Sequence, residues 1–276
     1  MSGLDQTLVL KLRSAARSRS ATKGPGPSLD EVTDFITEGT RLRRYCAVAD
    51  HSSTDVVFVF AHGGYFIFGD LDLQDRYCRH LALAFRGVVY SVDYALAPEA
   101  RAVASIRDVL AVASLARVEH PDARIVLCGD SAGGTVAFLA ATKLRGTPHA
   151  ADALFLTNPN LDLSLAMFDR LAPDGPDPDL LKSAIEEWAG PSGAVFDFSP
   201  MASVLDGLPA TLIAVGVLDS LVPEAVAMNE RLLAAGVRTE ILQLDGVGHG
   251  FVSGSNERES FARDQAFVAL RAFLEI

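Results

Sequence analysis

Apolar runs alternate with segments of helical spacing along most of this chain. The runs are rich in β-branched residues and several are continuous, which is typical of strands covered on both faces. They predict strands at Arg43–Val48, Val56–Ala61, Gly87–Asp93, Arg124–Cys128, Ala153–Asn158, Thr211–Gly216 and Thr239–Leu244. Helices are predicted between them at Gln74–Phe85, Ser105–Glu119, Ser131–Leu144, Pro223–Ala235 and Asn256–Leu274. The alternation predicts an α/β fold with a doubly wound, mostly parallel sheet, which binds ligands beyond the carboxyl ends of its strands.

Two regions depart from this alternation. Residues 1–40 contain a turn-rich stretch at 23–28 and then an acidic segment, Leu29–Glu38, which we interpret as helix-like. We expect residues 1–40 to form a cap over a pocket or a mobile arm. Residues 162–200 combine a Pro/Asp loop with a short helix that carries Trp188, and we expect a lid-like insertion in an α/β domain spanning residues 41–276.

Composition narrows the class of protein. The chain has 276 residues, 49% of them hydrophobic, and a net charge of −11, which argues against nucleic acid or an anionic membrane surface as a partner. It shows neither a signal-peptide core nor an apolar run of membrane-spanning length, and its three cysteines lie far apart. We therefore expect a cytoplasmic protein without disulfides. The sequence leaves the choice between a monomer and a homodimer open.

The strongest chemical signal is Gly129-Asp130-Ser131-Ala132-Gly133-Gly134, which directly follows an apolar run and precedes a helical segment. A Gly-x-Ser-x-Gly pattern between a strand and a helix predicts a nucleophile elbow. The flanking glycines allow a strained turn, and the helix N-terminus favours developing negative charge. Ser131 is therefore the candidate nucleophile, with a structural turn as the alternative.

A serine hydroxyl needs a base, usually a histidine held by a carboxylate. His149 and His249 are the histidines that follow Ser131. His149 lies between a helix and a strand, whereas His249 lies in a glycine-rich loop after the last predicted strand, where a base belongs. Asp219 follows the preceding strand and is the predicted carboxylate, although it could instead cap the next helix. Asp206 and Asp245 are weaker choices because of their positions.

Backbone N–H groups are needed to stabilise an oxyanion. The strand Val56–Ala61 runs directly into His62-Gly63-Gly64-Tyr65, and we expect donors from Gly63, Gly64 and Ala132. Tyr65, Phe66 and Trp188 are candidates for lining a substrate pocket, and ordinary core packing is the alternative for each. No metal and no organic cofactor is predicted.

Taken together, His62-Gly63-Gly64-Tyr65-Phe66, Asp93-Tyr94-Ala95-Leu96-Ala97-Pro98-Glu99 and the Ser131 motif resemble the hormone-sensitive-lipase-like group of α/β-hydrolases. Gly216-Val217-Leu218-Asp219 and His249-Gly250-Phe251 match that group too. The resemblance implies the α/β-hydrolase fold and serine carboxylesterase activity, with Ser131, Asp219 and His249 as the catalytic triad. It also implies that Tyr94 and Glu99 support a loop near the site. Tyr65 stands where the group usually has a third glycine, and this loop is similar to that of kynurenine-formamidase-like hydrolases.

These observations predict hydrolysis of small carboxylic esters of short or medium acyl length through an acyl-enzyme. Amide or formamide hydrolysis is the nearest alternative because of Tyr65. Acyl transfer or acyl hydrolysis within a pathway is another. A ligand-binding receptor on the same fold is the alternative from a different class, and the presence of His249 argues against it.

Overall fold

The computed structural model describes residues 4–22, 24, 26–48 and 54–276. An eight-stranded sheet has the order β1-β2-β4-β3-β5-β6-β7-β8. Its strands are β1 (Glu31–Thr37), β2 (Thr40–Cys46), β3 (Val56–Ala61), β4 (Val88–Asp93), β5 (Arg124–Asp130), β6 (Ala153–Thr157), β7 (Ala210–Gly216) and β8 (Thr239–Leu244). Pairing is antiparallel for β1 with β2 and for β2 with β4, and parallel elsewhere. The predicted α/β fold with a mostly parallel, doubly wound sheet is confirmed.

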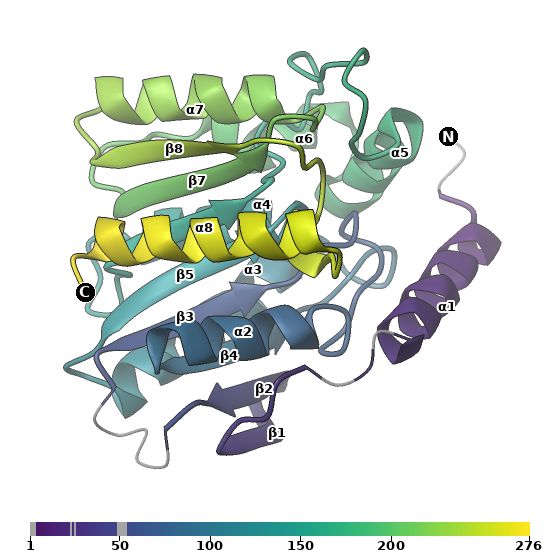
Figure 1. The fold of residues 1–276 in the computed structure, drawn as a ribbon. Coiled ribbons are helices and arrows are strands. Elements are labelled where there is room, and N and C mark those ends of the chain that lie inside the picture. The colour runs from purple at the N-terminus through teal and green to yellow at the C-terminus, as the bar shows by residue number, and fades with distance from the viewer. Residues whose placement is uncertain (1–3, 23, 25, 49–53) are drawn as a thin grey trace.

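Helices cover both faces of the sheet. Their bounds are α1 (Gln6–Thr22), α2 (Asp75–Phe85), α3 (Ala102–Glu119), α4 (Ala132–Leu144), α5 (Pro178–Ala189), α6 (Ser192–Phe198), α7 (Val222–Ala234) and α8 (Glu257–Leu274), with short 3-10 turns η2 (Pro200–Ala202) and η3 (Phe251–Ser253). Side chains of α2 and α8 form one core cluster with the sheet, while α3, α4 and α7 share the other. Figure 1 shows α2 and α8 in front of the sheet. Because both faces are covered, all six residues of β3 are buried, which explains its uninterrupted apolar run.

The segment Leu29–Glu38 is where the sequence interpretation was wrong. It is not helix-like: Glu31–Thr37 forms strand β1, an edge strand paired in register with β2. Four of its seven residues are β-branched, which favours strand over helix. The two residues of the connecting turn, Glu38 and Gly39, both have positive φ angles of 48° and 84°, as a tight hairpin turn requires.

The sheet order places the functional loops. After β3 the chain moves outward to β4 and then returns to add β5 on the other side of β3, so the order reverses between β3 and β5. In doubly wound sheets, ligands bind at the carboxyl ends of strands at such a reversal. The loops that follow β3 and β5 carry Gly63 and Ser131. Helix α1 and the insertion helices α5 and α6 lie beyond that end of the sheet (Figure 1).

Candidate active site

Ser131 stands on a sharp turn between β5 and α4. Its backbone angles, φ 54° and ψ −121°, are unusual for a residue with a side chain, and such strain is often found at functional sites. Its N–H donates to the Thr157 carbonyl at 2.9 Å. A Cβ atom at Gly133 would lie 2.1 Å from the Ala61 carbonyl oxygen, and one at Gly129 would lie 2.3 Å from the Gly133 oxygen. Both positions therefore need glycine for α4 to begin this close to β3 and β5.

His249 and Asp219 meet Ser131 in one hydrogen-bonded row. The Ser131 Oγ lies 2.9 Å from His249 Nε2, and His249 Nδ1 lies 2.8 Å from Asp219 Oδ2. Asp219 is buried, and its other oxygen accepts the Leu221 N–H at 3.1 Å, just before α7. The carboxylate therefore serves both the turn and the histidine. The structure brings together all three residues that the sequence singled out.

The other histidine and carboxylates lie elsewhere. His149 is in the turn between α4 and β6, and Asp206 precedes β7, so both are at the amino ends of the parallel strands, opposite Ser131. Asp245 follows β8 but is exposed and has no hydrogen bond to His249 among the described residues. These positions agree with the choice of His249 and Asp219.

Two residues near this row were not found by sequence reasoning. Asn158, directly after β6, donates its side-chain N–H to Asp219 Oδ2 and so fixes that carboxylate. Asp174, in the Pro/Asp loop of the insertion, accepts the His249 backbone N–H at 3.1 Å. A strand-end polar residue was a signal for Asn158, whereas nothing in the spacing of the Pro/Asp loop indicated that Asp174 would reach His249.

The surroundings shift the pKa of His249 upward. Burial is the largest single influence and would lower this pKa below 6.5, but the charge and hydrogen bond of Asp219, together with the charges of Asp130 and Asp174, outweigh it. The imidazolium form is therefore favoured relative to an isolated histidine. The reaction of a catalytic triad passes through an imidazolium, and it proceeds more readily when that charged form is stabilised.

The loop after β3 differs from expectation at one donor. The Gly63 N–H donates to the side-chain oxygen of Gln74 at 2.8 Å, so the prediction that Gly63 offers a free donor is wrong. Within the described residues, the N–H groups of Gly64 and Tyr65 have no acceptor. Ala132 is the first residue of α4, where backbone N–H groups lack partners within the helix. Available donors thus come from Gly64, Tyr65 and Ala132.

Side chains from distant segments hold this loop in place. Tyr94 donates its hydroxyl to the His62 carbonyl at 2.7 Å, and its ring stacks on His62. Glu99 pairs with Arg13 of α1, whose guanidinium also donates to the Ile67 carbonyl at 2.8 Å. Tyr94 therefore supports the loop directly, and Glu99 supports it through Arg13.

The aromatic candidates divide into two groups. Phe66 and Trp188 are fully buried and stack on each other with ring centroids 4.2 Å apart. Neither ring touches solvent-accessible space, so the prediction that they line a substrate pocket is wrong, and they serve as core. Tyr65 is half-buried at φ 55°, and its hydroxyl accepts the Asp177 N–H at 2.8 Å at the start of α5. Tyr65 thus links the loop after β3 to the insertion.

Comparison with known proteins also indicates an α/β-hydrolase. Residues 58–253 match the family described as having the alpha/beta hydrolase fold. Esterase LipI of Mycobacterium tuberculosis is 35% identical over 254 residues, covering 86% of this chain and 78% of LipI. Carboxylesterase NlhH of the same organism is 33% identical over 214 residues, covering 71% of this chain and 66% of NlhH. A solved esterase of Pyrobaculum calidifontis is 26% identical, covers 96% of this chain and 93% of its own, and has a TM-score of 0.86.

The chain belongs to the α/β-hydrolase family, and the resemblance to its hormone-sensitive-lipase-like group is confirmed. In the part of the chain that the structure describes, every helix is too short or too polar to cross a bilayer.

Proposed function

We propose that this protein hydrolyses small carboxylic esters of short or medium acyl length, with Ser131 as nucleophile. The observation that carries the proposal is the unbroken row from Ser131 Oγ through His249 to Asp219. Such a row activates a serine for acyl transfer and needs no metal or organic cofactor. The relatives named esterase and carboxylesterase support the choice of esters.

In the first half-reaction, His249 Nε2 takes the Ser131 proton as Oγ attacks the ester carbonyl carbon. The resulting oxyanion accepts hydrogen bonds from the N–H groups of Gly64, Tyr65 and Ala132, replacing the set with Gly63 that the sequence suggested. As the intermediate collapses, His249 returns its proton to the leaving alcohol. Asp219 holds the imidazole orientation and stabilises its positive charge throughout.

In the second half-reaction, water attacks the acyl-enzyme and gives its proton to His249. The tetrahedral intermediate uses the same donors, and as it collapses to release the acid, His249 returns the proton to Ser131 Oγ. The raised pKa of His249 assists both formations of the imidazolium, at the cost of requiring a higher pH to keep the resting base neutral.

We further propose that α1 acts as a cap and residues 162–200 as a lid over the site. Tyr65 and Arg13 carry the contacts that join these segments to the loop after β3. Tyr65 would narrow the alcohol side of the substrate pocket. The buried free thiols of Cys46, Cys78 and Cys128 support a reducing, cytoplasmic setting.

The substrate test is a comparison of hydrolysis rates. p-Nitrophenyl esters of increasing acyl length should be cleaved fastest at short or medium length, and N-formylkynurenine more slowly. Tyr65 in its loop is the observation that favours the second candidate, formamide hydrolysis. A kcat/KM for N-formylkynurenine above those for all the esters would replace the ester proposal with that alternative.

A further inference from the structure

One buried amide joins three loops of the site. Gln74 is 4% exposed, and its side-chain oxygen accepts the Gly63 N–H at 2.8 Å. Its side-chain nitrogen donates to Asp130 Oδ2 at 3.0 Å and to Ser253 Oγ at 2.9 Å. Gly63 directly precedes the proposed oxyanion donors, Asp130 directly precedes Ser131, and Ser253 ends the η3 turn that follows His249.

We propose that Gln74 is a positioning residue that sets the spacing between the oxyanion donors, the nucleophile and the base. The inference rests on the proposed ester hydrolysis. Gln74 does not touch the reacting atoms and acts through the backbone of the three loops.

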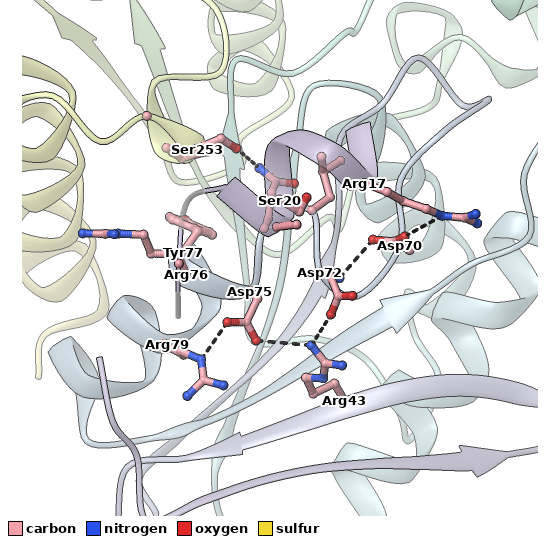
Figure 2. A pocket seen from close by; sticks show the side chains of 16 residues that line it. Arg17, Ser20, Arg43, Asp70, Asp72, Asp75, Arg76, Tyr77, Arg79 and Ser253 are labelled. Atoms are coloured by element: carbon pink, nitrogen blue, oxygen red, sulfur yellow. Dashed lines mark hydrogen bonds and ion pairs between the residues drawn. The ribbon is translucent and has the colours of Figure 1, made fainter. Parts of the chain in front are cut away.

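Capping of its own helix does not explain Gln74. It occupies the N-cap position of α2, yet its side chain makes no capping hydrogen bond. Residues that cap helices well have short side chains, whereas this longer amide reaches out to the loops. The first turn of α2 is itself held by Asp75, which bonds Arg43 at 3.2 Å and Arg79 at 2.7 Å, as Figure 2 shows. The N-terminal end of α2, from which the Gln74 side chain extends, is therefore held in place.

The loops that Gln74 joins are closely packed. A Cβ atom at Gly63 would lie only 3.1 Å from Asp130 Oδ2, so the loop after β3 and the nucleophile turn are in direct contact. The Gln74 amide accepts a hydrogen bond from the loop after β3 and donates one to the nucleophile turn, which no apolar side chain can do. Without it, a buried N–H and a buried carboxylate oxygen would each lose a partner, and the loops would shift to recover one. Small displacements of oxyanion donors have large effects on rate.

Gln74 also influences the pKa values of Asp130 and, through it, of His249. Burial raises the pKa of the Asp130 carboxyl, while the charge of His249 and the hydrogen bonds from Thr157 and Gln74 lower it, and the charge of Asp219 raises it. The Asp130 charge in turn raises the pKa of His249. Loss of the Gln74 N–H donor would favour neutral Asp130 and so lower the pKa of His249. A residue that only filled space would leave that pKa unchanged.

Gln74 also lines a polar pocket of about 530 Å³, with residues of α1, α2 and the turn that contains Ser253. Figure 2 shows Ser253 among the residues that line this pocket, and its hydroxyl accepts the Gln74 side-chain N–H at 2.9 Å. The third bond of the amide thus links the N-cap position of α2 to the η3 turn.

The decisive variant is Gln74→Met, which keeps the length of the side chain and removes all three bonds. Thr239→Val is its control, because it removes one partly buried hydrogen bond, to Asn229 at 2.9 Å, at the amino end of β8, away from the site. Thermal unfolding is measured for both. We expect kcat of Gln74→Met to fall about 10- to 100-fold with little change in KM. The acid limb of its pH–rate profile should move to lower pH. Equal kcat in Gln74→Met and Thr239→Val would overturn the proposal.

Gln74→Glu decides the matter if the Met variant does not fold. A protonated Glu can accept from Gly63 and donate to Asp130, whereas an ionised Glu repels the Asp130 carboxylate. The ratio of variant to wild-type kcat should therefore rise as pH falls, and a ratio independent of pH would overturn the positioning role. Ester hydrolysis by the wild-type protein is measured alongside. If the proposed function is wrong, the wild type is inactive on esters. If only the positioning role of Gln74 is wrong, the wild type is active and the ratio is independent of pH.

Discussion

The loops after β5 and β3 lie side by side at the same edge of the sheet, but they are held in different ways. The turn at Ser131 is fixed by its own backbone, because glycines at 129 and 133 allow α4 to begin against β5 and β3. The loop at Gly63 is fixed by side chains from elsewhere, including Gln74, Tyr94 and Arg13. A local motif therefore identifies the first loop in the sequence, whereas the second depends on contacts that no local pattern contains.

The largest expected effect lies in the loop after β5. Ser131→Ala should lower kcat by about 10⁴-fold or more, because it removes only the nucleophilic oxygen. The fold should persist, since the backbone contacts of the turn do not involve this oxygen. Ester hydrolysis and thermal unfolding measure the two properties. A variant that retained more than about a tenth of wild-type activity would exclude Ser131 as nucleophile.

The carboxylate behind the histidine is the next test. Asp219→Asn should lower kcat by roughly 10²- to 10⁴-fold, because an amide sets the wrong imidazole tautomer and removes the negative charge. Asp245→Asn is the control, because Asp245 is exposed and its substitution should leave kcat nearly unchanged. The reverse order of effects in steady-state kinetics would show that Asp245 is the partner of His249.

The pH–rate profile tests the electrostatics around His249. A base must be neutral to accept the serine proton, and its raised pKa keeps it protonated to a higher pH. The acid limb of kcat/KM should therefore have its midpoint above pH 6.5, the ordinary histidine value. Asp174→Asn removes one of the charges that raise this pKa and should move the limb to lower pH. A limb that stays in place in this variant would contradict the assigned influence of Asp174.

Tyr65 gives the smallest expected effect and tests the loop after β3. Its φ of 55° suits glycine, so Tyr65→Gly removes the ring and also relieves backbone strain. We expect the ratio of kcat/KM for a tert-butyl ester to that for the matching ethyl ester to rise about 3- to 10-fold.

Tyr65→Phe is the matched control for that measurement. It keeps the ring and removes only the bond to the Asp177 N–H. The tert-butyl to ethyl ratio should stay near the wild-type value in this variant. If Tyr65→Gly leaves the ratio unchanged or lowers it, the ring points away from the alcohol side of the pocket.

These two loops also show how far the sequence could be interpreted. The strands from Val56 onward and the row Ser131–His249–Asp219 were predictable, because apolar runs and strand-end positions are local properties. The occupied N–H of Gly63 was not, since its partner Gln74 lies 11 residues away and on another element. The burial of Phe66 and Trp188 was not either, because the direction of an aromatic ring depends on tertiary packing. Strand β1 was predictable in principle from its β-branched residues and the turn at Gly39.

The most direct test of the proposed chemistry is covalent labelling by a fluorophosphonate, which reacts with activated serines. The protein would be treated with the probe, digested and analysed by mass spectrometry, with Ser131→Ala as the control. One phosphonyl adduct is expected, on the peptide that contains Ser131, with parallel loss of ester hydrolysis and no adduct in the variant. An adduct on another residue that accompanies the loss of activity, or full hydrolysis with no adduct at Ser131, would contradict the account.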